Sequence, residues 1–392
     1  MFRIASTESR VRSLLHPMFR ATPGTKVAVL GMVGALLALT AVTADAAGPK
    51  WTVVSSPNKG NPSTLSGVSC ISPTLCIAVG DSGLQGSEKT LSEKWNGTKL
   101  TVVPSPPTTG SEVIELNGIS CVSASFCIAV GRQFKSGGDV ILSEKWNGST
   151  WSLLTSPTIG PDASLDLNSV SCKTSTFCMA VGWFVGEPAE AFAMKWNGSS
   201  WATEAVPDDS NTDDNILKSV SCPTTTLCIA VGTGASGQLI DKWNGTTWSI
   251  VSNTANFALF GVRCRSTTFC MAVGAKAGMG TNVVTLAEKF NGTTWSVLTS
   301  PNVSGSPADF LLSVSCTGTT FCMAAGQDQG SGTTEKTLTE QWNGTKWSVV
   351  TSPNTSSSLN IINSVSCTTA TGGNFCLAVG QAAELTLVEK YS

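Results

Sequence analysis

The cysteines are the residues of this sequence whose number and spacing most clearly imply chemistry. All 14 fall into pairs, six with five intervening residues and the last with eight. Zinc ligands are the alternative, but they usually come as two closely spaced pairs near one another. We therefore expect disulfides, each closing a small loop and contributing about 2–3 kcal/mol in the chain-entropy model. The expected pairs are Cys70 with Cys76, Cys121 with Cys127, Cys172 with Cys178, Cys222 with Cys228, Cys264 with Cys270, Cys316 with Cys322, and Cys367 with Cys376.

Two short segments have the composition of binding sites. Trp183 and Phe184 form an aromatic pair at the start of a loop, where they could stack on a sugar ring or pack against a neighbouring loop. Asp209, Asn211 and Asp213 reproduce the alternating oxygen ligands of a calcium loop. That loop lacks the usual glycine after its third ligand and the closing glutamate, so a solvated acidic loop is the alternative. No cofactor other than calcium is indicated.

The absence of histidine restricts the possible enzymes. The one histidine, His16, lies in the N-terminal segment, which leaves the rest of the chain without a Ser-His-Asp triad or a histidine-ligated metal. A pair of carboxylates for glycoside hydrolysis remains open, with Asp162, Glu187 and Asp208 among the loop acids, although nothing singles out two of them. The formal net charge of −2 argues against nucleic acid or an anionic membrane as a partner.

The N-terminal segment predicts export. Several basic residues precede an uncharged apolar run over residues 27–42, and small residues at 44 and 46 follow it. This is the pattern of a secretory signal peptide over residues 1–46, with a mature domain over 47–392. An uncleaved membrane anchor is the alternative. Export would place the cysteines in an oxidising environment, so we expect a secreted protein, either free or attached to the cell surface.

One pattern of about fifty residues recurs along the whole domain. Successive first cysteines are 42 to 52 residues apart, and each unit contains Leu-x-Ser/Gly-Val-x-Cys, Cys-Ile/Met-Ala-Val-Gly and Trp-Asn-Gly-x-x-Trp, with small variations. Short runs rich in Val, Ile and Trp between Gly and Pro indicate strands. Asn-Gly between two such runs indicates a hairpin turn. Each unit therefore predicts four strands, which is the pattern of one propeller blade.

The two ends of the domain fit together as one blade. The last unit stops after its third strand at residues 389–392, and the domain opens at Trp51 with a fourth strand that has nothing before it. A ring that pairs its edge strands would join these two segments. We therefore predict an all-β, seven-bladed β-propeller with four-stranded blades and one disulfide in each, closed by the Trp51 strand on the 389–392 strand.

The units resemble those of kelch-type and Asp-box propellers. The Val-Gly that ends the second strand and the Trp-x-x-Leu/Val-x-x-Pro after the third are similar to kelch units. Kelch units usually have two glycines where this sequence has one, and the aspartate of the Asp-box is aromatic here, as in Trp146 before Trp151. The units also resemble secreted bacterial repeat proteins. This resemblance implies a fold and does not imply an activity.

Residues that recur in nearly every unit are expected to have structural roles. The aromatic residues that end the third strand and begin the fourth should pack blade against blade. The acid two residues before the third-strand aromatic, as in Glu93 before Trp95, should lie at the surface or pair with the adjacent lysine.

Function is expected where the repeat varies. The leading hypothesis is a non-catalytic, monomeric module that binds carbohydrate, cell-envelope polymer or protein through its loops. The alternatives are an extracellular glycoside hydrolase or lyase that uses loop carboxylates, and a structural or adhesion component of the cell surface.

Overall fold

The chain separates into two units, residues 1–48 and 49–392, and the description below concerns the second. The computed structural model describes residues 48–392 apart from 59, 85, 107–110, 136–137, 158–163, 186–187, 209–213, 235–236, 253–256, 280–281, 304 and 331–333. The signal sequence lies outside the described residues, so its presence and its removal remain predictions. Within the described residues, no helix has the length and apolarity to cross a membrane.

The described residues form 28 strands, which group by antiparallel pairing into units of four. Numbered along the chain, the first sheet contains β2 (Ser63–Ser72), β3 (Leu75–Ser82), β4 (Lys89–Trp95) and β5 (Leu100–Val102). The second contains β6 (Ser111–Ser123), β7 (Phe126–Lys135), β8 (Gly138–Trp146) and β9 (Trp151–Leu153). The third contains β10 (Ser164–Thr174), β11 (Phe177–Val185), β12 (Glu190–Trp196) and β13 (Trp201–Glu204).

The remaining sheets follow the same plan. The fourth contains β14 (Ile216–Thr224), β15 (Leu227–Gly234), β16 (Gly237–Trp243) and β17 (Trp248–Ser252). The fifth contains β18 (Phe257–Ser266), β19 (Phe269–Ala277), β20 (Val283–Phe290) and β21 (Trp295–Leu298). The sixth contains β22 (Ala308–Cys316), β23 (Cys322–Gln329), β24 (Glu335–Trp342) and β25 (Trp347–Val349), and one parallel residue pair joins β20 to β22. The seventh contains β26 (Asn360–Ala370), β27 (Gly373–Ala382), β28 (Leu385–Tyr391) and β1 (Trp51–Val53).

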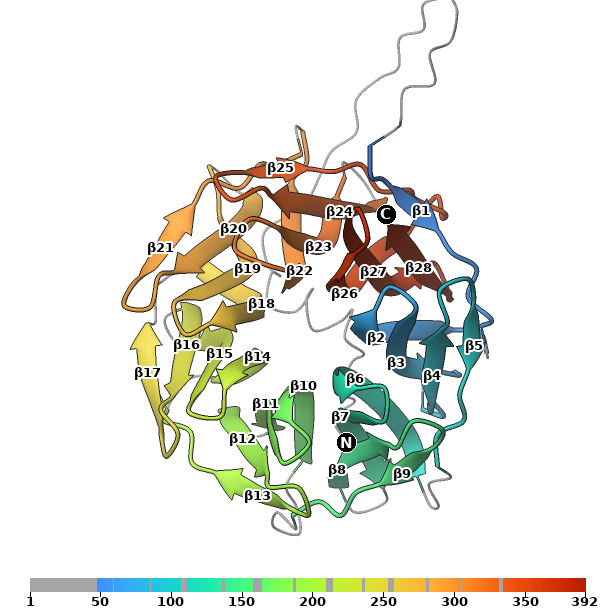
Figure 1. Cartoon of the computed structure of the whole chain (residues 1–392), viewed down its shortest axis with the longest axis vertical. Helices are drawn as coiled ribbons and strands as arrows, with labels where there is room; N and C mark the ends of the chain where they lie inside the picture. Colours follow the sequence, from blue (N-terminus) through green and yellow to red (C-terminus); the bar gives the residue numbers. More distant parts are fainter. Residues whose placement is uncertain are drawn as a thin grey trace, which may run out of the picture. The chain divides into compact units, whose positions relative to one another are not determined.

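The sheets are arranged radially, with the first strand of each toward the centre and the fourth outermost (Figure 1). The strand from the start of this unit completes the seventh sheet, because Trp51 pairs with Tyr391 and Val53 with Glu389 in antiparallel register. Hydrogen bonds also join the seventh sheet to the first: Asn363 Nδ2 donates to the Leu65 carbonyl over 3.1 Å. The two ends of residues 49–392 are therefore held by backbone pairing and by side chains.

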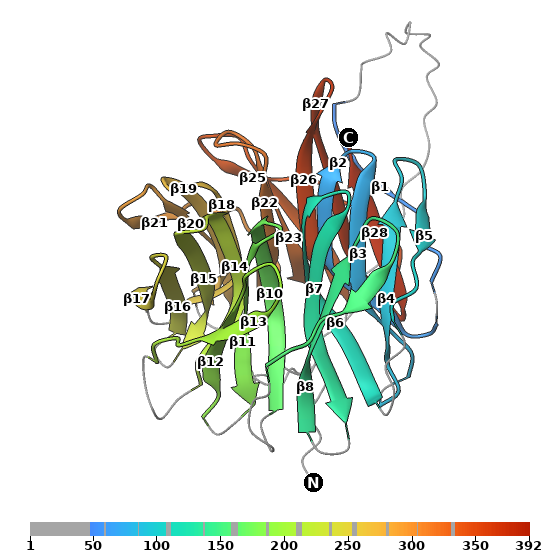
Figure 2. The ribbon, with the colours of Figure 1, turned by 60° about the horizontal axis from the view of Figure 1, so that its bottom comes forward.

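All seven predicted cysteine pairs are disulfides, and each joins a first strand to a second strand with Cα atoms 3.9 to 4.1 Å apart. The hairpins that carry them lie at one end of the ring, as the β2–β3 and β26–β27 hairpins show (Figure 2). This arrangement confirms the prediction that the two cysteines of a pair face each other across a hairpin. The bonded pairs are Cys70 with Cys76, Cys121 with Cys127, Cys172 with Cys178, Cys222 with Cys228, Cys264 with Cys270, Cys316 with Cys322, and Cys367 with Cys376.

A serine of one sheet hydrogen-bonds to the first strand of the next sheet. The first strands are the inner edges of their sheets. The N–H groups that point away from the second strand therefore have no strand to pair with. The N–H of the first cysteine donates instead to a serine Oγ of the preceding sheet over 2.9 to 3.0 Å. We call each such bond a serine clamp. The clamped pairs are Cys70–Ser366, Cys121–Ser69, Cys172–Ser120, Cys222–Ser171, Cys264–Ser221 and Cys367–Ser315.

Each first strand also contains a β-bulge, and the bulge explains the single glycine that ends the second-strand motif. In the first sheet, Leu65 pairs with Gly80 and Gly67 with Val79, so Ser66 is the extra residue. A Cβ on Gly80 would lie 2.0 Å from the Thr64 carbonyl oxygen. The equivalent glycines of the other sheets meet a carbonyl oxygen at 1.9 to 2.1 Å. A side chain at this position therefore collides with backbone, and only glycine fits.

The aromatic residues pack between sheets, in agreement with the sequence analysis. Trp146 and Trp151 are 1% and 6% exposed, and their ring centroids lie 5.6 Å apart in a tilted arrangement. The Trp146 indole N–H donates to the Ala124 carbonyl in the turn of the disulfide hairpin. Similar aromatic pairs lie in five other sheets.

The acids near these aromatics are buried, and the expectation that they lie at the surface was wrong. A residue two positions before the aromatic shares its face of the strand and so points into the space between sheets. Ser56, which follows β1, donates to both carboxylate oxygens of Glu93 over 2.8 and 2.9 Å. In the third sheet this place is taken by Met194. The buried acids are Glu93, Glu144, Asp241, Glu288, Glu340 and Glu389, each at most 3% exposed.

Substitution of a bulge-facing glycine tests the steric argument. Gly232→Ala places a methyl group 1.9 Å from the Ile216 carbonyl oxygen, so the strands must separate. We expect the free energy of unfolding to fall by about 3 kcal/mol, measured by urea denaturation. Gly318→Ala is the control, because no atom lies within 4 Å of the added carbon. Equal losses in the two variants would contradict the explanation.

The buried acids predict that the fold loses stability as the pH rises. Burial raises the pKa of Glu93 and Glu144 to about 7, and that of Glu340 and Glu389 to about 8, from an ordinary value of 4.5. The folded state therefore binds protons that the unfolded state has released. The resulting stabilisation is full below pH 4.5 and is lost as the pH rises through 7 to 8.

Denaturation at pH 5 and pH 8 measures this loss, and Glu389→Gln should reduce it by removing one titrating group. The variant should be more stable than the parent at pH 8, since its neutral amide replaces a buried charge. Glu190→Gln, at an exposed position, should leave the pH dependence unchanged. A parent protein that is more stable at pH 8 than at pH 5 would refute the assignment.

Candidate functional site

The bulges place one extra residue from every sheet around the central channel. In chain order these residues are Ser66, Asn117, Asn168, Lys218, Phe260, Leu312 and Asn363. We call this set the bulge ring. It lines a pocket with a cavity volume of about 130 Å³, together with the neighbouring residues of the same first strands. Every sheet thus contributes an equivalent residue to this pocket.

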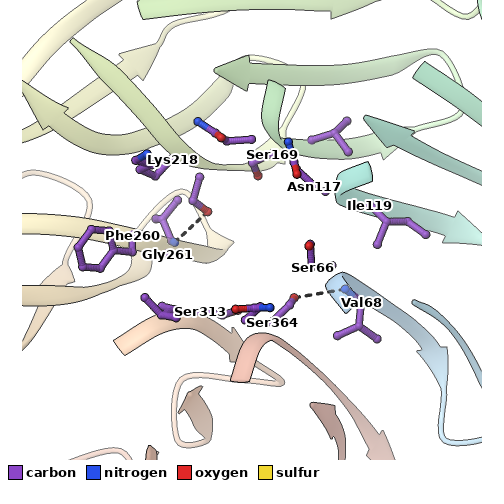
Figure 3. Close-up of a pocket in the computed structure, with 18 of the residues that line it drawn as sticks. Ser66, Val68, Asn117, Ile119, Ser169, Lys218, Phe260, Gly261, Ser313 and Ser364 are labelled. Carbon is purple, nitrogen blue, oxygen red and sulfur yellow. Dashed lines mark hydrogen bonds between the residues drawn. The ribbon is translucent and has the colours of Figure 1, made fainter. Parts of the chain in front are cut away.

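The bulge ring is polar over most of its circumference and apolar over the rest. The seventh, first, second and third sheets contribute three asparagines and a serine, and the fourth contributes Lys218. The fifth and sixth sheets contribute Phe260 and Leu312, which pack with Phe310 in an apolar cluster. Ser66, Asn117 and Ser169 surround the pocket, whereas the Phe260 ring points away from its middle (Figure 3). The interior of the pocket is therefore mainly polar.

The three asparagines are held by the next sheet through their amide nitrogens. Asn117 Nδ2 donates to the Leu167 carbonyl over 3.0 Å and to Asp166 Oδ1 over 2.8 Å. Asn168 Nδ2 donates to the next sheet's backbone in the same way over 2.7 Å, and Asn363 Nδ2 does so over 3.1 Å. Within the described part of the chain, no donor reaches the Oδ1 atoms of these asparagines. Each amide is thus fixed in orientation with an acceptor to spare.

A charged cluster lies beside the bulges of the first two sheets. Arg132 on β7 forms an ion pair with Glu115 on β6, with Nε 2.8 Å from Oε2. Burial, and next the negative charges of Glu115 and Glu88, raise the pKa of Asp81 to about 7, while Arg132 opposes this shift. The charge of this side of the ring therefore changes near neutral pH. Among the described residues, no three acids, cysteines or histidines converge as a metal site would require.

In the sequence-predicted aromatic pair, Trp183 is buried and Phe184 is half-buried. Trp183 is 8% exposed and packs with Ala189 and with Ile216 of the next sheet. The Phe184 ring lies edge-on to Phe192, with centroids 4.9 Å apart. Since little of the Trp183 surface can meet a ligand, its position favours the packing alternative over stacking on a sugar.

The predicted calcium ligands Asp209, Asn211 and Asp213 lie outside the described residues, and so do the loop acids Asp162 and Glu187. Asp208 and Asp214, which flank the calcium segment, are exposed and hold local structure. The Asp208 carboxylate accepts from the Asn215 side chain, and Asp214 Oδ1 accepts from the Ala189 N–H over 2.8 Å. A calcium site in this loop therefore remains a prediction.

Sequence reasoning missed the bulge ring. Its signal was the variable position in Leu-x-Ser/Gly-Val, which differs from unit to unit while its neighbours recur. In a regular strand that position would point between sheets, and only the bulge turns it toward the channel.

Comparisons with known proteins identify the fold. No protein-family model matches the sequence, and no curated protein is significantly similar to it. The structure of U3-55K is similar with a TM-score of 0.58 and 13% identity, over 88% of this chain and 99% of that one. The WD40 repeats of RRP9 give 0.57 and 12%, over 88% and 99%. YCF48 from Cyanidioschyzon merolae gives 0.50 and 14%, over 87% and 98%. At these identities the likeness concerns the fold alone, and that fold is a repeat β-propeller.

Proposed function

We propose that residues 49–392 are a closed, seven-bladed β-propeller that acts as a non-catalytic binding module, with its ligand held by the bulge ring. The pairing of β1 with β28 and the hydrogen bonds between the seventh and first sheets support closure. The variation of the bulge ring supports binding, because these positions differ from sheet to sheet on an otherwise regular scaffold. We include in the same proposal that the repeats are of a kelch-like or Asp-box-like kind.

The asparagine carbonyls are the observation that carries the proposal. Three amide oxygens with fixed orientation belong to residues that line the pocket, so a fitting ligand presents several hydrogen-bond donors. A hydroxyl-rich carbohydrate meets this requirement, whereas a cation would lie near the positive charge of Lys218. The cavity is smaller than the ~300–1,000 Å³ of typical small-molecule sites. It would therefore take one end of a larger molecule, such as the terminal residue of a glycan or cell-envelope polymer.

The place of action that we propose is outside the cell, free or at its surface. Seven disulfides, one in each sheet, fit an oxidising compartment. The predicted signal peptide over residues 1–46 would supply the export route, with removal of the leader releasing the module.

A binding screen against neutral glycans and envelope polysaccharides tests this function. The double variant that combines Asn168→Ala with Asn363→Ala removes two of the fixed acceptors, and we expect at least a tenfold loss of affinity in calorimetry. Asn343→Ala is the matched control. Its side chain accepts hydrogen bonds from the Thr345 and Lys346 N–H groups in an exposed hairpin turn, so stability should fall while binding stays.

Two outcomes would contradict the proposal. If the purified chain binds a glycan and the double variant binds it equally well, the bulge ring is not the site. If the chain binds none of the polysaccharides but captures a protein, the carbohydrate assignment is wrong. Conversion of the bound glycan to products would show that the module is an enzyme.

A further inference from the structure

The series of serine clamps is broken at one interface, between the fifth and sixth sheets. Arg263 on β18 stands where the other six first strands carry a serine directly before the first cysteine. Cys316 on β22 is fully buried. Its N–H is equivalent in position to the N–H groups of the other six first cysteines, each of which donates to a serine. Among the described residues, no serine hydroxyl accepts from it. The sixth sheet thus lacks an acceptor that every other sheet receives from its neighbour.

Arg263, which is half-buried, occupies the place of the missing serine, and in the described chain no acid forms an ion pair with it. Its Nε atom is inaccessible to solvent and has no hydrogen-bond partner in the described chain. Burial, and next the charge of Arg265, lower its pKa to about 10, which leaves it positive at neutral pH. The other two arginines of the domain differ, since Arg132 is paired with Glu115 and Arg265 is exposed.

The Arg263 side chain and the Cys316 N–H, which belong to the same interface, both need a hydrogen-bond acceptor. A buried donor is unfavourable unless it meets an acceptor. The buried Arg263 Nε–H has no partner in the described chain, and the buried Cys316 N–H has no serine acceptor there. A serine hydroxyl would satisfy the N–H alone. An oxyanion satisfies both, because its oxygens accept from a guanidinium in a planar, two-pronged arrangement and from a backbone amide at the same time.

We propose that Arg263 and the Cys316 N–H form a binding site for a small oxyanion, a carboxylate or phosphate group, between the fifth and sixth sheets. The anion takes the place that the serine oxygen occupies at the other interfaces. This site does not depend on the bulge ring, which lies farther along the same strands, or on the ligand proposed for it.

Thermal unfolding of the purified full chain in potassium phosphate, potassium acetate and potassium chloride at equal ionic strength tests the site. At ten times its Kd, the bound anion should raise Tm by about 2–4 °C over chloride. A response to phosphate alone or to acetate alone identifies which group the site prefers. Arg263→Ser installs the residue of the other interfaces. It should abolish the shift and unfold at a higher temperature than the parent in chloride.

Arg265→Ser is the matched control, because it removes an exposed arginine and should keep the shift. Equal shifts in the parent and in Arg263→Ser would show a general salt effect and overturn the proposal. The absence of a shift in the parent with both phosphate and acetate would overturn it as well. If Arg263→Ser does not fold, Arg263→Lys decides: a shift as large as that of the parent contradicts a site built on a planar guanidinium.

Discussion

The structure depends on how the backbone N–H groups at the inner edge of each sheet find hydrogen-bond acceptors. A first strand has a partner on one side only, and its other side faces the channel, where no further strand can fit. The serine clamp resolves this at six of the seven first cysteines by giving the cysteine N–H an acceptor from the preceding sheet, as in Cys121 and Ser69. The disulfide from Cys121 to Cys127 holds that strand to its hairpin. The short motif Val-Ser-Cys, as at Ser69 and Cys70, therefore takes part in one disulfide within its sheet and in two clamps, one to each neighbouring sheet.

The bulge next to the clamp separates what must stay constant from what can vary. The glycine opposite the bulge must stay constant for a steric reason, because the bulged backbone brings a carbonyl oxygen against it, as at Gly80. The variable part is the extra residue itself, which the bulge directs to the channel. Ring construction therefore constrains the glycine and the serines, whereas the bulge ring is free to differ among sheets. The same reasoning marks Arg263 as unusual, because it replaces a residue that the ring otherwise requires.

Much of the fold could be predicted from the sequence, because its signals are local and repeated. The cysteine spacing predicted the disulfides, and Asn-Gly with its flanking tryptophans predicted the outer hairpins. The bulge ring could not be predicted, since a register shift depends on the backbone of two strands together. The sequence also did not predict whether certain side chains point into the protein or toward solvent. Trp183 is an unusual aromatic, but the sequence does not say that it packs on Ile216 instead of meeting solvent. The prediction that the acids near the third-strand aromatics lie at the surface was wrong for the same reason: Glu389, for example, is buried.

Hydrogen exchange of the first-cysteine amides, measured by NMR at residue resolution, tests the central claim most directly. Cys70 is the informative residue, because its N–H donates to Ser366 across the junction between the first and seventh sheets. A ring clamped throughout predicts that Cys70 exchanges as slowly as Cys121, and that Cys316, which has no serine acceptor, exchanges faster. Rapid exchange at Cys70 with slow exchange at Cys316 would mean that the ring is open at its junction and that serine clamps do not hold the sheets together.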